Sequence, residues 1–251
     1  MKRKNLIIMA ALLLSALILR VIQVFTVIEA KTGFYNRGSD TVGTVLTVLV
    51  FGFCFAGAIF ARNAFKIEKS TAVPLITLPS CLLGAALLFE VFAETFANES
   101  MGWQVLFMKS LGVLAAVYFI ALGFVKMPDI CHIVPALYMI MRIICSFINI
   151  ASLSLIAENV LYTAALCCSL LFFVSYAAHN CLEENKGNSL NFRAVLAASL
   201  CFVTVISNIL AEIFSKGGYN HIPLYSQFVM LAVSLFIGWF TVLKVVKSNK
   251  E

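Results

Sequence analysis

The chain has 251 residues, of which 62% are hydrophobic and 12% are charged, and its formal net charge is +6. Its mean hydropathy of +0.99 excludes an ordinary soluble domain, in which apolar and charged residues are more evenly balanced. We therefore expect an integral membrane protein.

Apolar runs long enough to cross a bilayer recur along the whole sequence. A spanning helix needs about 20 predominantly apolar residues, and the sequence divides into eight such runs. They cover residues 5–28, 42–61, 73–96, 102–125, 130–151, 158–179, 191–214 and 222–245. The expected fold class is thus an all-α polytopic membrane protein with eight transmembrane helices. The connections between the runs are too short to hold a folded domain outside the membrane.

The first run follows the basic start MKRK, a pattern that is typical of signal peptides. Its apolar stretch is longer than the core of such a peptide, no A-x-A cleavage site follows it, and Arg20 interrupts it. An uncleaved first transmembrane helix is the better interpretation. This helix also carries Gln23 within the same apolar stretch.

The connection KTGFYNRG, residues 31–38, is the most individual of the loops. It resembles a Thr-Gly-Phe-aromatic loop that follows the first helix in uncharacterised bacterial multi-pass membrane proteins. The resemblance covers this loop and implies no activity. Gly33 and Gly38 permit a tight re-entry of the chain, and Phe34 and Tyr35 suit the lipid headgroup region. A lid over an outer cavity is the alternative role for this loop.

Lysine and arginine residues outside the spans gather on one side of the membrane. With the N-terminus placed inside, the inner side holds Lys2, Arg3, Lys4, Arg62, Lys66, Lys69, Lys126, Lys186, Arg193, Lys244, Lys247 and Lys250. The outer side then holds Lys31, Arg37 and Lys216. This excess of twelve against three predicts that both termini are cytoplasmic, because positive loops stay inside. We expect a bacterial plasma membrane as the location.

The sequence also suggests an internal duplication. Residues 18–28 align with 140–150 and residues 89–96 align with 207–214, which places Arg20 on Arg142, Glu94 on Glu212 and Glu90 on Asn208. Helices rich in the same apolar residues align readily by chance, but the matching of rare charged residues favours a true repeat. The predicted halves, residues 1–125 and 126–251, would be similar four-helix units in parallel orientation within one membrane domain.

Polar residues inside the spans are the candidates for a functional site. A charged side chain at the centre of a spanning helix costs about 2.5–3.5 kcal/mol on insertion scales, so it normally faces protein or water. The candidates share the outer half of the membrane. They are Arg20, Gln23, Glu90, Glu94, Lys109, Arg142, Asn208 and Glu212.

The arginines favour a site for an acidic group, because a guanidinium can hold a carboxylate or phosphate through two hydrogen bonds. We therefore expect a transporter, or a solute-binding membrane subunit, for a small anionic or zwitterionic solute. Arg20 and Arg142 would hold the solute, with Glu94, Glu212 and Lys109 as counter-ions or proton-coupled partners. The alternative is a non-catalytic scaffold or sensor subunit, in which Arg20 pairs with Glu94 and Arg142 with Glu212 to fasten helices together.

Other classes of function lack sequence support. The eight cysteines contain no C-x-x-C pair and lie in or near apolar runs, so we interpret them as small buried hydrophobes. The paired Glu183 and Glu184 resemble those of CAAX-type intramembrane proteases, but Arg193 lies too far along and the later histidine motifs are missing. We expect no enzymatic activity, no metal, no cofactor and no nucleic acid. The expected partners are the lipid bilayer, a small solute and, for either function, a further subunit.

Overall fold

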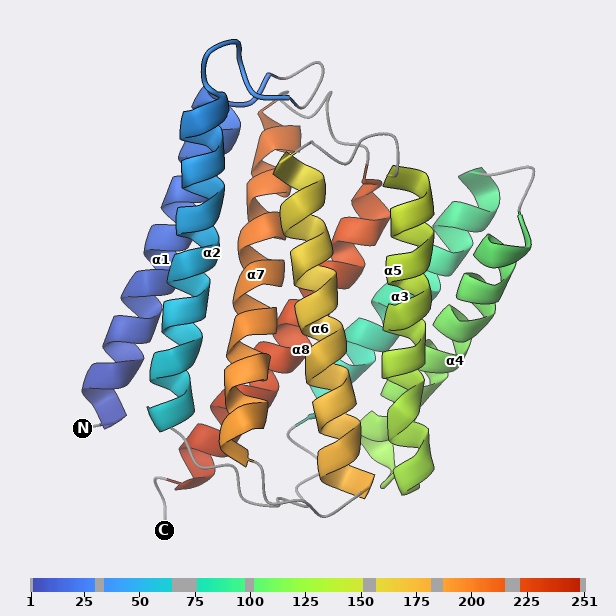
Figure 1. Cartoon of the computed structure of the whole chain (residues 1–251). Coiled ribbons are helices and arrows are strands. Elements are labelled where there is room, and N and C mark those ends of the chain that lie inside the picture. Colours follow the sequence, from blue (N-terminus) through green and yellow to red (C-terminus); the bar gives the residue numbers. More distant parts are fainter. Residues whose placement is uncertain are drawn as a thin grey trace.

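Long α-helices make up nearly all of the computed structural model, which describes residues 2–29, 34–64, 76–97, 102–150, 157–181, 187–214 and 222–248 (Figure 1). They are α1 (Lys2–Thr26), α2 (Asp40–Ala64), α3 (Thr77–Ala97), α4 (Trp103–Phe124), α5 (Val134–Ile150), α6 (Ala157–Cys181), α7 (Gly187–Ile213) and α8 (Leu224–Ser248). All eight helices contain a stretch long and apolar enough to cross a membrane. The prediction of an all-α, multi-pass membrane protein is confirmed.

Helices are the expected solution for such a sequence, because a helix satisfies its backbone hydrogen bonds internally where lipid offers none. The described ranges hold no β-strand apart from an isolated antiparallel bridge between Ile28 and Tyr35. The predicted boundaries agree with the observed ones to within a few residues. The split between the fifth and sixth runs was the least marked in the sequence, and it falls between Ile150 and Ala157.

The fifth run was predicted to be one continuous helix, but its first residues differ from that prediction. Residues Asp129–Ile133 form a short 3₁₀ helix, η1, before α5 starts at Val134. Pro135 explains the change, because proline has no backbone N–H and so cannot donate the α-helical bond to the carbonyl of Cys131. The Cys131 carbonyl accepts from the N–H of Val134 instead. The Cys131 N–H in turn donates to the Pro128 carbonyl at 3.0 Å, which is the tighter 3₁₀ pattern.

Helix α7 is the centre of the bundle. It contacts α1, α2, α6 and α8, and 72% of its spanning stretch is buried inside the protein against 22% for α1. The α1–α2 hairpin packs against one side of it, and α8 runs obliquely behind α6 and α7 to reach α3 (Figure 1). The α3–α4 hairpin lies on the other side of the bundle, where α4 contacts α5.

The α3–α4 hairpin closes around a glycine. A Cβ atom built on Gly84 would lie 2.6 Å from Ile120 Cγ1 and 3.0 Å from the Ala116 carbonyl oxygen. Small residues at such crossings allow helix backbones to approach closely, which is a common basis of packing between membrane helices. Gly84 therefore sets the separation of α3 and α4, and with it the position of the polar residues farther along α3.

The first residues of α1 and the last residues of α8 lie at the same end of the bundle (Figure 1). We call the opposite end the distal end. Helices α1, α3, α5 and α7 finish there and α2, α4, α6 and α8 begin there. The cytoplasmic placement of the termini and the plasma membrane location remain predictions. The same holds for the two parallel halves, whose residues are in direct contact where α2 packs on α7 and α3 on α8.

Candidate functional site

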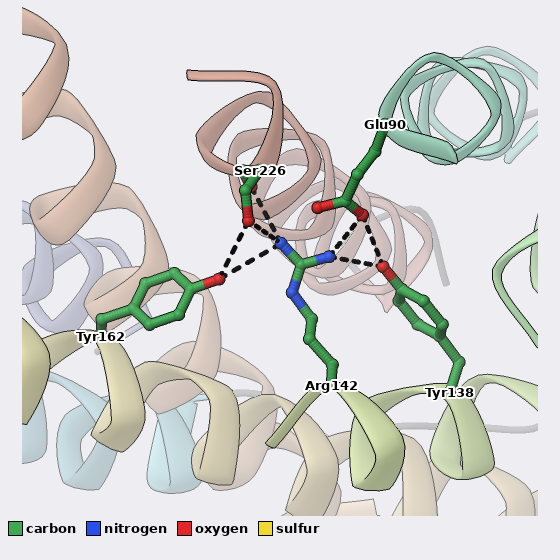
Figure 2. Close-up of polar contacts among 5 residues, drawn as sticks. All are labelled: Glu90, Tyr138, Arg142, Tyr162 and Ser226. Atoms are coloured by element: carbon green, nitrogen blue, oxygen red, sulfur yellow. Dashed lines mark hydrogen bonds and ion pairs between the residues drawn. The ribbon is translucent and has the colours of Figure 1, made fainter. Parts of the chain in front are cut away.

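Arg142 forms the centre of a buried polar cluster, which Figure 2 shows in close-up. Its side chain lies near the middle of α5, about 12 Å along the helix axis from the last residue. Nη1 donates to Glu90 Oε2 of α3 at 2.6 Å. The hydroxyl of Tyr138 donates to the same carboxylate oxygen at 2.8 Å and also accepts from Arg142 Nη1. The Arg142 and Glu90 side chains are only 4% and 7% exposed, so this ion pair is shielded from solvent and lipid.

The other terminal nitrogen of Arg142 binds two further helices. Nη2 donates to Tyr162 Oη of α6 at 3.2 Å, to Ser226 Oγ of α8 at 2.6 Å and to the Ser226 carbonyl at 3.0 Å. The Tyr162 hydroxyl and Ser226 Oγ lie 3.2 Å apart and hydrogen-bond each other. One guanidinium therefore connects α3, α5, α6 and α8 (Figure 2). We call these residues, Glu90, Tyr138, Arg142, Tyr162 and Ser226, the Arg142 centre.

The Arg142 centre is not fully satisfied. Within the described ranges, no group accepts a hydrogen bond from Arg142 Nε, although that atom is buried. One turn along α3 from Glu90, the buried atom Glu94 Oε2 likewise has no hydrogen-bond partner among the described residues. Buried polar atoms without partners are uncommon, and each costs about 1–3 kcal/mol, more when the group is charged. In this cluster the two terminal nitrogens of Arg142 are hydrogen-bonded. Arg142 Nε remains as a donor without an acceptor, and Glu94 Oε2 as an acceptor without a donor, among the described residues.

Lys109 of α4 lies beside this centre. Its Nζ donates to Thr95 Oγ1 of α3 at 3.3 Å, and its residue is only 6% exposed. The positive charges of Lys109 and Arg142 both act on the Glu94 carboxylate, and Glu90 adds a like charge. Four of the predicted site residues, Glu90, Glu94, Lys109 and Arg142, are therefore brought together by the fold.

Arg20 and Gln23 lie in a second cluster, on α1 and α2. Arg20 is fully buried, and its Nη1 donates to Gln23 Oε1 at 2.7 Å. Gln23 Nε2 in turn donates to the Gly43 carbonyl and to Thr47 Oγ1 of α2, each at 2.7 Å. This chain of bonds, which we call the Arg20 centre, fastens α1 to α2.

The first loop covers the Arg20 centre from the distal end. The Tyr35 hydroxyl lies 3.0 Å from Thr47 Oγ1, and the Tyr35 ring rests on Gly43, where an added Cβ would be 2.2 Å from its Cε1. Gly38 turns the chain back with φ of 80°, a conformation that glycine adopts readily. Tyr35 thus contacts protein, whereas Phe34 is 45% exposed. Gly33 lies outside the described residues.

The structure places the remaining predicted residues on α7. Asn208 is buried at 2% exposure, and Ala211, one turn farther along, packs with Val24 and Ile28 of the first helix and its loop. Glu212 is exposed. The expected pairing of Arg142 with Glu212 is therefore wrong, because Arg142 binds Glu90 instead. Glu94 of α3 was the partner expected for Arg20. It interacts electrostatically with Lys109 of α4 and Arg142 of α5.

Three members of the Arg142 centre were not predicted from the sequence. Tyr138 carried a usable signal, since it precedes Arg142 by four residues and so shares its helical face. Tyr162 and Ser226 carried none, because they lie 20 and 84 residues away in sequence. Only the arrangement of α6 and α8 brings them to the guanidinium.

The donor set of these clusters does not resemble a metal site. Among the described residues, no group of three or more His, Cys, Asp or Glu side chains could hold a metal ion. The sequence matches no protein-family model, no curated protein and no solved structure.

Proposed function

We propose that the protein is a membrane transporter, or a solute-binding membrane subunit, whose site for a small anionic or zwitterionic solute is the Arg142 centre. The observation that carries this proposal is a buried arginine whose Nε has no acceptor within the described chain, although its other two nitrogens are occupied. Charged residues inside a membrane-spanning bundle mark solute or ion pathways in many transporters. An incomplete hydrogen-bond set at such a charge is what an incoming carboxylate or phosphate would complete.

Glu90 acts in this proposal as the internal counter-ion of the empty site. Its carboxylate occupies one terminal nitrogen of Arg142 at 2.6 Å, the kind of contact that an acidic solute would make. Solute binding would exchange one carboxylate for another without leaving a bare charge in the membrane. Tyr138, Tyr162 and Ser226 would hold the guanidinium in place during that exchange, since each bonds to it from a different helix position.

A stability screen tests the proposal directly. Purified protein in detergent would be heated with each member of a panel of small carboxylates, amino acids and phosphate compounds. A ligand that binds only the folded state stabilises it by about 2.7 kcal/mol at a concentration of 100 times its Kd. We expect at least one acidic compound to raise the Tm of the native protein and to leave Arg142→Gln unchanged.

Glu212→Gln is the matched control for charge removal, because Glu212 is an exposed acid on α7 outside the Arg142 centre. It should keep the response of the native protein. A compound that stabilises the native protein and Arg142→Gln equally would place the solute site elsewhere. Uptake of the active compound into proteoliposomes would then separate a transporter from a binding subunit.

The alternative function is a non-catalytic scaffold or sensor subunit, and the direct contact between the buried Arg142 and Glu90 favours it. Paired charges can serve only to fasten helices together. A charge exchange, Glu90→Arg with Arg142→Glu, distinguishes the two functions. If the double variant recovers both folding and cellular function that each single variant loses, the pair is structural and the solute-binding proposal fails. If the Arg142 centre is a solute site, it requires the positive charge on α5. The double variant would then recover folding but not cellular function.

A further inference from the structure

A groove runs between α3 and α4 on the surface of the bundle, and its lining includes Lys109, which lies beside the Arg142 centre. It has a volume of about 530 Å³, within the range of small-ligand sites. Its lining is almost wholly apolar, and the walls contributed by α4, Trp103, Leu106, Phe107 and Val113, are 73%, 62%, 50% and 41% exposed. Such walls on a spanning helix face lipid, so the groove opens to the membrane.

The groove also holds a cation near its distal end. Lys109 belongs to its lining, and its Cα lies six residues, about 9 Å, below the start of α4. The ammonium group is directed back toward the membrane surface, because it donates to Thr95. Thr95 is only two residues, about 3 Å, from the end of α3. The lysine thus places its charge near the headgroup level, while its stem lies among apolar side chains.

The polar and apolar parts of the groove lie at different depths below the distal end of α4. Trp103 is the first residue of α4 and is exposed, and tryptophan is common at the membrane interface. Val91 and Val113 line the deeper part, and Val113 lies ten residues, about 15 Å, from the start of α4. That depth is about half of a hydrocarbon core of about 30 Å. The groove therefore combines a buried positive charge near its distal end with an apolar trough about as long as one leaflet.

We propose that this groove is a binding site for an anionic phospholipid, with its phosphate at Lys109 and Trp103 and an acyl chain along Leu106, Phe107 and Val113. The occupant is a lipid because the walls are open to the bilayer, and it is anionic because Lys109 is the charged residue among the described residues that line the groove. The site is separate from the proposed solute site and does not depend on it. The Lys109 charge also acts on the Glu94 carboxylate, so this acid would compete with the headgroup.

Tryptophan fluorescence tests this site, because the chain has two tryptophans and one of them, Trp103, lines the groove. Trp239→Phe leaves Trp103 as the single reporter. This protein would be reconstituted in phosphatidylcholine vesicles that contain brominated phosphatidylglycerol or, at the same low mole fraction, brominated phosphatidylcholine. Bromine quenches a nearby indole, so the ratio of the two quenching constants measures headgroup selectivity.

We expect about a fivefold preference for phosphatidylglycerol, the ratio that corresponds to about 1 kcal/mol for one lysine near an anionic lipid. In the same background Lys109→Gln should abolish the preference, and Glu94→Gln should increase it. Should Lys109→Gln fail to fold, Val113→Phe, which fills the trough without changing a charge, should reduce quenching by the anionic lipid. Val48→Phe is its matched control, because Val48 is 64% exposed at a similar depth on α2, away from the groove.

Two outcomes would overturn the proposal. Equal quenching by both lipids would mean that the groove holds ordinary boundary lipid. Weak quenching by both lipids would mean that a protein surface, such as a second copy of the chain, covers Trp103.

Discussion

Replacing Glu90 with glutamine is the most informative single perturbation of the Arg142 centre. It removes the counter-ion but keeps the shape of the side chain and an acceptor for the Tyr138 hydroxyl, which bonds to Glu90 at 2.8 Å. Arg142 is then left as a buried charge supported by neutral groups alone. Removing one partner of a buried ion pair costs about 3–5 kcal/mol. Because Tyr138, Tyr162 and Ser226 still bond to the guanidinium, we expect the lower limit of about 3 kcal/mol.

Reversible unfolding in mixed detergent micelles would measure this loss. Glu212→Gln makes the same chemical change at an exposed position of α7 and should stay within about 0.5 kcal/mol of the native protein. The double variant Glu90→Gln with Arg142→Gln should be more stable than the sum of the single losses predicts, because neither charge remains buried alone. Equal losses for Glu90→Gln and Glu212→Gln would refute the inference that Glu90 and Arg142 form an ion pair in a shielded environment.

Three further substitutions test the geometry around the two centres. Gly43→Ala should displace Tyr35 from α2 and increase trypsin cleavage at the exposed Arg37, whereas Gly52→Ala, where a Cβ would meet nothing within 4 Å, should leave the cleavage rate unchanged. Tyr162→Phe should cost about 0.6–1.7 kcal/mol in the same unfolding assay, the range measured for hydrogen bonds between membrane helices; no loss would mean that its hydroxyl does not support Arg142. Gly84→Val should force α3 away from α4 and cost about 1–3 kcal/mol, as overpacking does; an unchanged unfolding midpoint would contradict the close helix approach.

The sequence predicted the architecture well because each spanning helix is a local feature. A run of about 20 apolar residues has to become a helix in lipid, whatever its neighbours are. The departure at the start of the fifth run was also local, since Pro135 removes one donor from the helical ladder. Neither result required knowledge of how the helices pack.

The residues of the Arg142 centre were predicted from the sequence in part, for reasons that differ among them. The depth of Arg142 and of the acids follows from helix length alone, so their presence in the distal half was foreseeable. The sequence did not show that Glu90 rather than Glu212 would bind Arg142. Each of these acids has a polar residue four positions away, and their helices have similar compositions. That choice depends on which helix faces α5, and the oblique course of α8 decides which serine reaches the guanidinium (Figure 1).

The separation of Arg20 from Arg142 has the same origin. The two arginines align in sequence, yet Arg20 bonds to Gln23, which in turn bonds to α2, whereas the partners of Arg142 among the described residues lie on α3, α5, α6 and α8. The sequence treats them as equivalents, whereas the fold gives them different neighbours. The buried Nε of each arginine lacks a hydrogen-bond partner among the described residues. We propose the Arg142 centre for solute binding because it also contains an ion pair and joins four helices.

The most direct test of the account is the affinity of an active acidic compound for three forms of the protein, measured by isothermal titration. If Glu90 is a counter-ion that the solute displaces, Glu90→Gln should bind the compound more tightly than the native protein does, because the competing carboxylate is gone. Arg142→Gln should not bind it measurably. If Glu90→Gln binds no better, the solute does not displace Glu90, and if Arg142→Gln keeps the native affinity, the Arg142 centre is not the solute site.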